Sequence, residues 1–284
     1  MASVLALVFD FDDTLLPDST TQLLNASGED AKRFFDGLIP LAAEGYDPTV
    51  AFLNSFLDWI ATKKPPLASN GEALHRFGRS LGSSFFPGLP ELFADLRETT
   101  KRFRLGIEFY IVSGGLQDLV EGAVAGTPGL SGAFASIYAC RLAEEGGVFT
   151  RIKRCITFTE KTRYLFEINK GITPEQTLKA PYLVNEEVEE SRRRVPLRNM
   201  IYVGDGLTDI PCFSLLKKSK GLSFGVFDPT KPESANRAFL KFLQTGRVAG
   251  PYAPEYGREQ TLGSLIRAAV AARCAAIQVE NQAF

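Results

Sequence analysis

The chain has 284 residues, of which 45% are hydrophobic and 23% are charged, as in a globular protein with one substantial domain and a smaller one. Its 32 basic and 33 acidic side chains give a formal net charge of −1, so no basic surplus points to nucleic acid or an anionic membrane as a partner. We expect a cytoplasmic protein, because the four cysteines lack the spacing of a metal site or a disulfide scaffold and no signal peptide or long apolar span is evident.

The first predicted element is a buried parallel strand over Val4–Phe9, a short run of β-branched and aromatic residues. A long helical segment follows, because apolar residues recur at three- and four-residue spacing over residues 31–41, 50–60 and 72–81. A simple crossover helix needs far fewer residues, so we interpret this segment as an inserted cap. The predicted division is a core of residues 1–16 and 86–284 and a helical cap of residues 17–85.

After the cap, the sequence predicts a helix, a strand and a hairpin. Pro90 suits the first turn of a helix that runs to about Lys101. A second buried strand, residues 107–112, ends in Ser113-Gly114-Gly115. Residues 136–142 and 147–157 flank a Glu-Glu-Gly-Gly turn, which predicts a β-hairpin.

The last third of the chain begins with a polar insert, residues 173–196, that is rich in charge around residues 186–194. We interpret this insert as a solvated helix face, with a substrate-facing role as the alternative. A third strand, residues 200–203, ends in Gly204-Asp205-Gly206, and a weaker fourth covers residues 221–226. An Ala-rich helix is expected over residues 262–277. Three of the four strands thus end in polar or Gly-rich residues, at the edge where open α/β sheets bind ligands.

Two carboxylates directly after the first strand, Asp10 and Asp12, carry the strongest chemical signal. An aspartate can attack phosphorus and form an acyl-phosphate, while a second carboxylate protonates the leaving oxygen and later activates water. Clustered negative charge repels an anionic phosphate, so this chemistry needs a divalent cation. Mg²⁺ prefers oxygen ligands and fits Asp10, the backbone carbonyl of Asp12 and a further carboxylate.

The other strand ends supply the remaining groups. Asp205 and Asp209 follow the third strand and could bind or orient the metal. Ser113, with the amides of Gly114 and Gly115, could cradle phosphate oxygens, as clusters of backbone N–H groups do.

Phosphoryl chemistry also needs a fixed cation that offsets charge on the transferred group. Lys161 is our choice, with Lys153 as the nearby alternative. Together these segments resemble the four motifs of the haloacid dehalogenase (HAD) superfamily, in the order of its phosphoserine-phosphatase-like branch. The matching residues are Asp10 to Thr14 for the first motif, Ser113 to Gly115 for the second, Lys161 for the third, and Asp205 with Asp209 for the fourth.

This resemblance implies an α/β fold with a Rossmann-like parallel sheet, helices on both faces and a small helical cap. It also implies a Mg²⁺-dependent phosphatase that hydrolyses a small phosphomonoester through an aspartyl-phosphate. A phosphotransferase on the same fold and a non-catalytic module that binds a phosphorylated ligand are the alternatives. Dehalogenation resembles sites that lack the second aspartate, and Asp12 is present. Whether the protein is a monomer or a homodimer stays open.

The sequence departs from the family pattern at three positions. Ser19 stands where the related phosphoserine phosphatases carry a cap glutamate, with Asp18 beside it, which disfavours L-phosphoserine as the substrate. Thr208 replaces the motif-four asparagine and could still donate its hydroxyl to phosphate. Asp13 replaces a small residue, and we interpret it as a turn cap.

The only histidine, His75, is expected to be structural. Arg76 and Arg79 lie on the same predicted cap helix, where they form a solvated face or, alternatively, contact an anionic part of the substrate.

Overall fold

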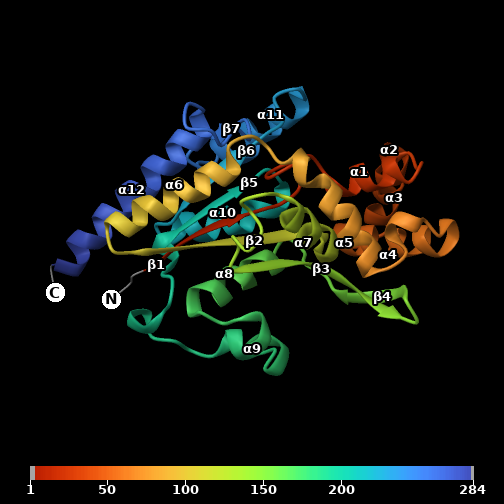
Figure 1. The fold of residues 1–284 in the computed structure, drawn as a ribbon, viewed down its shortest axis with the longest axis horizontal. Helices are drawn as coiled ribbons and strands as arrows, with labels where there is room; N and C mark the ends of the chain where they lie inside the picture. Colours follow the sequence, from red (N-terminus) through yellow and green to blue (C-terminus); the bar gives the residue numbers. More distant parts are fainter. Residues whose placement is uncertain (1–3, 283–284) are drawn as a thin grey trace.

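A computed structural model describes residues 4–282 and shows an α/β fold built on one seven-stranded sheet (Figure 1). The strand order is β4-β3-β2-β1-β5-β6-β7, and every neighbouring pair is parallel except β3 and β4. The predicted fold class is therefore confirmed. The strands are β1 (Val4–Phe9), β2 (Gly106–Leu116), β3 (Ser136–Glu145), β4 (Val148–Arg154), β5 (Met200–Gly204), β6 (Leu222–Val226) and β7 (Pro251–Tyr252).

Strand β1 lies at the centre of the sheet, between β2 and β5, and is buried from Leu5 to Phe9 because both faces of a parallel sheet are covered. The hairpin β3–β4 turns at Gly146 and Gly147, which both have positive φ, as a two-residue type I′ turn requires. The prediction that the second strand ends at residue 112 was wrong, because β2 continues through the Ser-Gly-Gly segment to Leu116. The two-residue edge strand β7 was not predicted, since it is too short to give a pattern.

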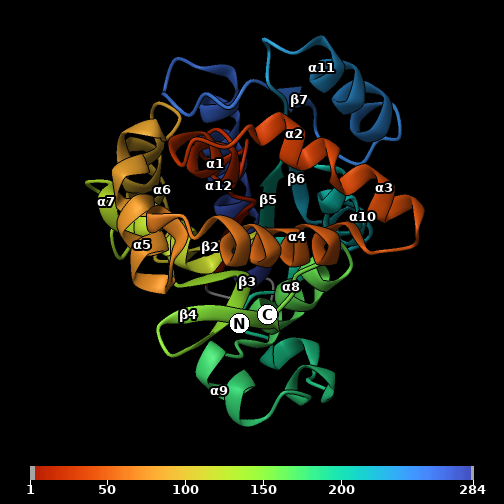
Figure 2. The same cartoon turned by 90° about the vertical axis from the view of Figure 1, so that its right-hand side faces the viewer.

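Helices cover both faces of the sheet (Figures 1 and 2). Helices α6 (Leu89–Arg102) and α12 (Thr261–Gln282) pack together on one face, and α8 (Glu160–Lys170) and α10 (Ile210–Lys218) lie on the other. The predicted helices near residues 90–101 and 262–277 correspond to α6 and α12. Gly88 precedes α6 with a φ of +89°, and a Cβ there would lie less than 3.0 Å from the backbone of Gly257, so only glycine fits.

Helix α12 is the one helix within residues 4–282 that is long and apolar enough to cross a membrane, by length and composition. A core helix meets the same criteria. One stripe of α12, including Ile266, Val270 and Cys274, is buried, and Arg267 forms a salt bridge with Asp95 of α6. These contacts are those of a helix that packs on a protein core.

Five of the six α-helices between β1 and β2 form a helical region beyond the carboxyl end of β1 (Figure 1). The single helix predicted over residues 31–41 was wrong, because two short helices meet at Gly37. Pro40 explains the break, since its ring would clash with the carbonyl of Asp36 in a continuous helix. Helix α1 was not predicted. The five helices are α1 (Ser19–Ala26), α2 (Ala31–Asp36), α3 (Leu38–Ala43), α4 (Pro48–Lys63) and α5 (Gly71–Ser80).

Helix α5 packs against α7 (Gln117–Gly126) of the core with its backbone in direct contact. A Cβ at Gly78 would lie less than 3.0 Å from the carbonyl oxygen of Leu119, and one at Gly122 would lie as close to the carbonyl oxygen of His75. Because glycines from both helices form this crossing, the two backbones approach more closely than any side chain would allow.

The polar insert contains the short helix α9 (Pro174–Lys179), which begins with a capping box between Thr173 and Gln176. The helix face predicted around residues 186–194 was wrong, because only a single 3₁₀ turn, Glu190–Arg192, forms there. Four glutamates within five residues repel one another and oppose a longer helix. The remaining short elements are α11 (Pro232–Ala238), a π-helical turn at Phe239–Leu243, and 3₁₀ turns at Pro66–Ala68, Leu81–Ser84, Leu183–Asn185, Leu197–Asn199 and Leu207–Asp209.

Candidate active site

The end of β1 delivers Asp10 to the edge of the sheet, where a buried lysine meets it. The side chain of Lys161, in the first turn of α8, is 1% exposed, and its Nζ lies 2.9 Å from Asp10 Oδ2 and 2.8 Å from Asp209 Oδ1. The alternative, Lys153, is exposed on β4. Of the two lysines considered from sequence, only Lys161 therefore reaches the carboxylates.

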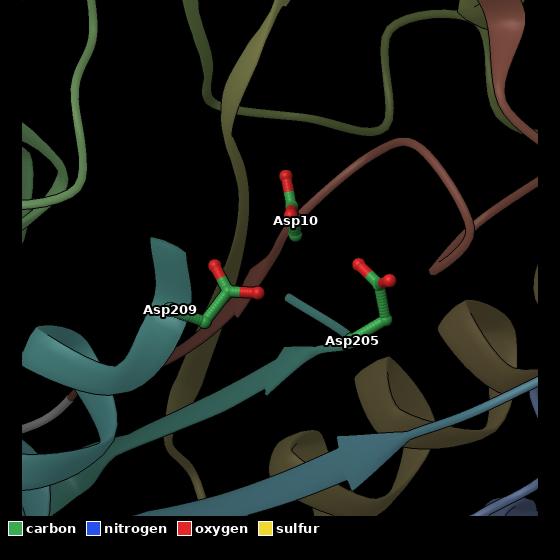
Figure 3. A group of neighbouring side chains, drawn as sticks. All are labelled: Asp10, Asp205 and Asp209. Carbon is green, nitrogen blue, oxygen red and sulfur yellow. The ribbon is translucent and has the colours of Figure 1, made fainter. Parts of the chain in front are cut away.

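Three carboxylates converge at this edge. Oxygen atoms of Asp10, Asp205 and Asp209 lie within 4.8 Å of one another, and Figure 3 shows the three side chains around a common space. Asp205 follows β5 directly, and Asp209 ends the 3₁₀ turn Leu207–Asp209. Parallel strands bring these segments together because their carboxyl ends share one edge of the sheet.

Asp209 is fully buried and is held by several donors at once. Its Oδ1 accepts hydrogen bonds from Lys161 Nζ and from the Tyr202 hydroxyl (2.7 Å), and its Oδ2 accepts one from the amide of Gly206 (2.9 Å). A Cβ at Gly204 would lie less than 3.0 Å from the Asp209 carboxylate, so glycine is required there. Sequence reasoning missed Tyr202, because a tyrosine inside a strand is an ordinary core residue and carries no distinguishing signal.

Asp12 faces the same space from the loop after β1. Its Oδ1 accepts a hydrogen bond from the amide of Ser19 (2.7 Å) at the start of α1. Gly115 lies opposite, and a Cβ at this position would lie 2.7 Å from Asp12 Oδ2. Gly115 thus leaves room for the carboxylate, and its own amide donates to Ser113 Oγ (2.9 Å).

A cavity of about 240 Å³ joins these groups to the helical region. Phe35 of α2 and Phe52 of α4 form its apolar side, with Asp18 and Thr20 near the start of α1. The sequence analysis did not identify either ring, because nothing local distinguishes a ring that lines a cavity from one that is packed in a core. The predicted residues that line the cavity are Asp10, Asp12, Asp13, Ser113, Gly114, Gly115, Lys161, Asp205 and Thr208.

Three residues weighed from sequence lie elsewhere. Arg76 is exposed on α5 and forms a salt bridge with Glu72 (2.6 Å), and neither His75 nor Arg79 lines the cavity. The alternative that these arginines contact the substrate therefore has no structural basis.

The site carries more negative charge than Lys161, together with Arg237 at 3.7 Å from Asp205, can offset. Burial, and then the charge of Asp209, raise the pKa of Asp10 to about 7, against the lowering effect of Lys161. Burial also raises the pKa of Asp12 and of Asp205 well above the usual range, and nearby carboxylates add to both shifts. A set of oxygen donors with surplus negative charge is the chemistry that a hard divalent cation prefers. The residues present therefore fit a metal ion.

Comparison with known proteins places these features in a family context. Residues 4–214 match the haloacid dehalogenase-like hydrolase family. A protein of Borreliella burgdorferi described as uncharacterized is 27% identical over 240 residues, which cover 75% of this chain and 79% of that protein.

Solved structures of similar fold include two phosphatases and a further hydrolase. A HAD family hydrolase of Salmonella enterica serovar Typhi superposes with a TM-score of 0.53 at 15% identity, covering 89% of this chain and 68% of that one. Cytosolic 5′-nucleotidase IIIB bound to cytidine gives 0.53 at 17% identity, covering 98% and 88%. A substrate-bound phosphoserine phosphatase gives 0.51 at 15% identity, covering 94% and 99%. At these identities the likeness shows a shared fold.

Proposed function

Because the chain belongs to the haloacid dehalogenase-like hydrolases, we propose that it is a Mg²⁺-dependent phosphatase that hydrolyses a small phosphomonoester through an aspartyl-phosphate. The observation that carries the proposal is the buried pair of salt bridges from Lys161 to Asp10 and Asp209. Lys161 holds Asp10 at the wall of a cavity that Asp12 also lines. A nucleophile, a fixed cation and a second carboxylate are thus within reach of one phosphoryl group.

Asp10 is the proposed nucleophile. The amide of Phe11 donates to its Oδ1 (2.8 Å) and Lys161 holds its Oδ2, so the carboxylate is oriented before substrate arrives. Its attack forms an oxygen–phosphorus bond as the bond to the leaving alcohol breaks. Water then attacks phosphorus and releases Asp10.

Asp12 is the proposed general acid and base. Burial raises its pKa, which favours the protonated carboxyl that a general acid needs to give a proton to the leaving oxygen. In the second step the resulting carboxylate takes a proton from the attacking water, which restores the starting state. The hydrogen bond from the Ser19 amide fixes the direction of this group.

Asp10, Asp205 and the backbone carbonyl of Asp12 are the proposed Mg²⁺ ligands, and Asp209 orients the site through its bonds to Lys161 and Gly206. When bound, the ion offsets negative charge on the phosphoryl group. Ser113, Gly114 and Thr208 line the cavity and are the proposed phosphate contacts. Gly115 contributes mainly by leaving space for Asp12.

Residues 17–85 are the proposed cap. Helices α2 and α4 place Phe35 and Phe52 over the site, so this region would exclude water and contact the leaving group. Ser19 is fully buried at the position of the cap glutamate, which supports a substrate other than L-phosphoserine, and the acidic side chain in this wall of the cavity is that of the adjacent Asp18.

The test is phosphate release from a panel of phosphomonoesters, with Mg²⁺ and with chelator. The panel contains L-phosphoserine, nucleoside 5′-monophosphates and sugar phosphates. We expect turnover of at least one ester in Mg²⁺, its loss in chelator, and a fall of at least about 10³-fold in Asp10→Asn. Asp36→Asn, which changes an exposed aspartate of α2, is the matched control and should retain full activity.

Turnover that survives Asp10→Asn would contradict the covalent mechanism. Binding of a phosphorylated compound without phosphate release from any ester would favour the non-catalytic module that binds a phosphorylated ligand. Addition of acceptor alcohols separates hydrolysis from transfer, because a phosphotransferase would yield a new phosphoester in place of free phosphate.

A further inference from the structure

A second and larger cavity, of about 540 Å³, lies beside β3, between α7, α8 and α9. This cavity shares no lining residue with the candidate active site. Figure 1 shows α8 and α9 on the same side of the sheet, and residues of both helices line the cavity. We propose that it binds a small metabolite that joins a carboxylate or phosphate at one end to an ammonium group at the other.

The anion end is defined by two arginines. Arg141 of β3 and Arg154 of β4 are direct partners in the antiparallel register, and both line the cavity. Like charges opposite each other destabilise a hairpin unless something offsets them. Within residues 4–282 no carboxylate forms a salt bridge with either arginine, although Asp118 is near enough for Arg141 to lower its pKa.

Arg154 is also oriented in advance. Its Nε donates to the carbonyl of Ala139 (2.8 Å), and its Nη2 donates to the side chain of Gln117. Burial lowers the pKa of Arg154 by more than nearby acidic groups, including Glu121 in the wall of the same cavity, raise it. An anionic group between the two guanidinium groups would supply the missing charge and accept paired hydrogen bonds.

The end of the cavity that would bind a cation is defined by Glu167 of α8, which is 1% exposed and lines the same cavity. Its Oε1 accepts from Arg163 Nε (3.0 Å), but among the described residues no donor reaches its buried Oε2. The Thr177 hydroxyl donates to the carbonyl of Thr173 (3.3 Å) and lies near enough to Glu167 to lower the pKa of its carboxyl group. A buried carboxylate oxygen without a partner costs free energy, which an ammonium group of a ligand would recover.

Aromatic rings and the polar insert complete the walls. Tyr138 and Tyr164 pack with ring centroids 4.5 Å apart and supply an apolar middle section. Helix α9 closes the outer side through Pro174 and Leu178, and the Leu178 side chain is 79% exposed. A cavity of this size suits a small molecule, with apolar walls and a few polar groups that fix its orientation.

The experiment is isothermal titration of the full chain with four probes, without any measurement of turnover. β-Alanine and 2-aminoethylphosphonate carry both ends, whereas propionate and ethylphosphonate lack the ammonium group. We expect at least one amino-bearing probe to bind. Its affinity should fall about 10-fold or more in Arg141→Gln and in Glu167→Gln. The two probe pairs distinguish a carboxylate from a phosphate as the anionic end.

The control is Arg151→Gln, which changes an exposed arginine of β4 that pairs with Glu145 outside the cavity and should leave affinity unchanged. The probes without an ammonium group should bind more weakly and should be insensitive to Glu167→Gln. Thermal unfolding of each variant verifies that it folds. Absence of binding by all four probes, or binding that Arg141→Gln and Glu167→Gln both leave intact, would overturn the proposal. Neither result bears on the phosphatase mechanism.

Discussion

The edge of the sheet and the helical region above it meet at one cavity but are built in opposite ways. At the edge, Asp10, Asp209 and Lys161 are buried, and Lys161 binds both carboxylates. The helical side offers two half-buried phenylalanine rings, Phe35 and Phe52, that contact each other and carry no polar atoms. The difference indicates that the sheet edge determines the reaction, whereas the helices determine which leaving group fits.

A second contrast divides the helical region itself. Helix α5 is packed onto α7 of the core through glycines such as Gly78 and Gly122, with backbone against backbone. Helices α2 and α4 are joined mainly by contacts between phenylalanine rings. Close packing resists displacement, and flexible apolar contacts tolerate it. Motion that admits a substrate is therefore expected in α1–α4, with α5 staying on the core.

The largest expected effect comes from removing the cation of the sheet edge. Lys161→Met leaves Asp10 and Asp209 buried without their shared partner. We expect phosphatase activity to fall by about 10²–10³-fold and the free energy of unfolding by about 3–5 kcal/mol at neutral pH. Lys153→Met, at an exposed position of β4, is the control and should change neither quantity.

The loss of stability should also depend on pH in a definite direction. The pKa of Asp10 is raised to about 7, so the folded protein binds a proton that the unfolded chain releases near pH 4. Without Lys161 this pKa rises further, and the destabilisation should grow as the pH increases through 7 and shrink towards pH 5. Urea unfolding of both proteins in chelator, at pH 5 and at pH 7 and above, measures this difference in the free energy of unfolding. A penalty that stayed constant with pH would contradict the electrostatic role given to Lys161.

The second effect tests the contact between α5 and α7. Alanine favours a helix over glycine by about 1 kcal/mol, so Gly122→Ala would stabilise an isolated α7. In the protein its Cβ would lie less than 3.0 Å from the backbone of His75, so we expect a net loss of about 1–3 kcal/mol in urea unfolding. Gly71→Ala, whose Cβ meets only ordinary contacts at 3.5 Å, should show no such loss. Equal stability of the two variants would mean that α5 and α7 separate easily.

The arrangement of the sheet edge could be predicted from sequence because local patterns and topology agree there. Asp10, Ser113 and Asp205 each accompany a strand of alternating or β-branched residues, and parallel strands direct their carboxyl ends to one edge. Lys161 does not follow a predicted strand, and it was proposed because phosphoryl chemistry needs a fixed positive charge.

The remaining features depend on contacts between segments far apart in the chain. The hydrogen bond from Tyr202 to Asp209 joins a strand to the turn after it, and the lining role of Phe35 depends on how α2 and α4 pack. Gly78 and Gly122 look locally like weak points of two helices, although together they allow the backbones of α5 and α7 to touch. The break between α2 and α3 differs from these features, because it follows from the local sequence: Pro40 disfavours a continuous helix over residues 31–41.

The smallest effect sharpens the division between reaction and selectivity. Phe52→Ala removes one ring from the helical side of the cavity and leaves the groups at the sheet edge untouched. We expect KM for the best ester to rise about 10-fold while kcat changes less, because an apolar contact of this kind contributes about 1–3 kcal/mol to substrate binding. Leu57→Ala, on the same helix but lining another cavity, is the matched control.

Inhibition by inorganic phosphate separates the two sides of the cavity. Phosphate has no leaving group and would contact only the sheet edge, so its inhibition constant should be the same in Phe52→Ala and in the unchanged protein. A parallel loss of phosphate affinity would mean that Phe52 shapes the sheet edge as well. The sheet edge and the helices would then not contribute separately to reaction and selectivity, because the ring that selects the leaving group would also position the residues that contact the phosphoryl group.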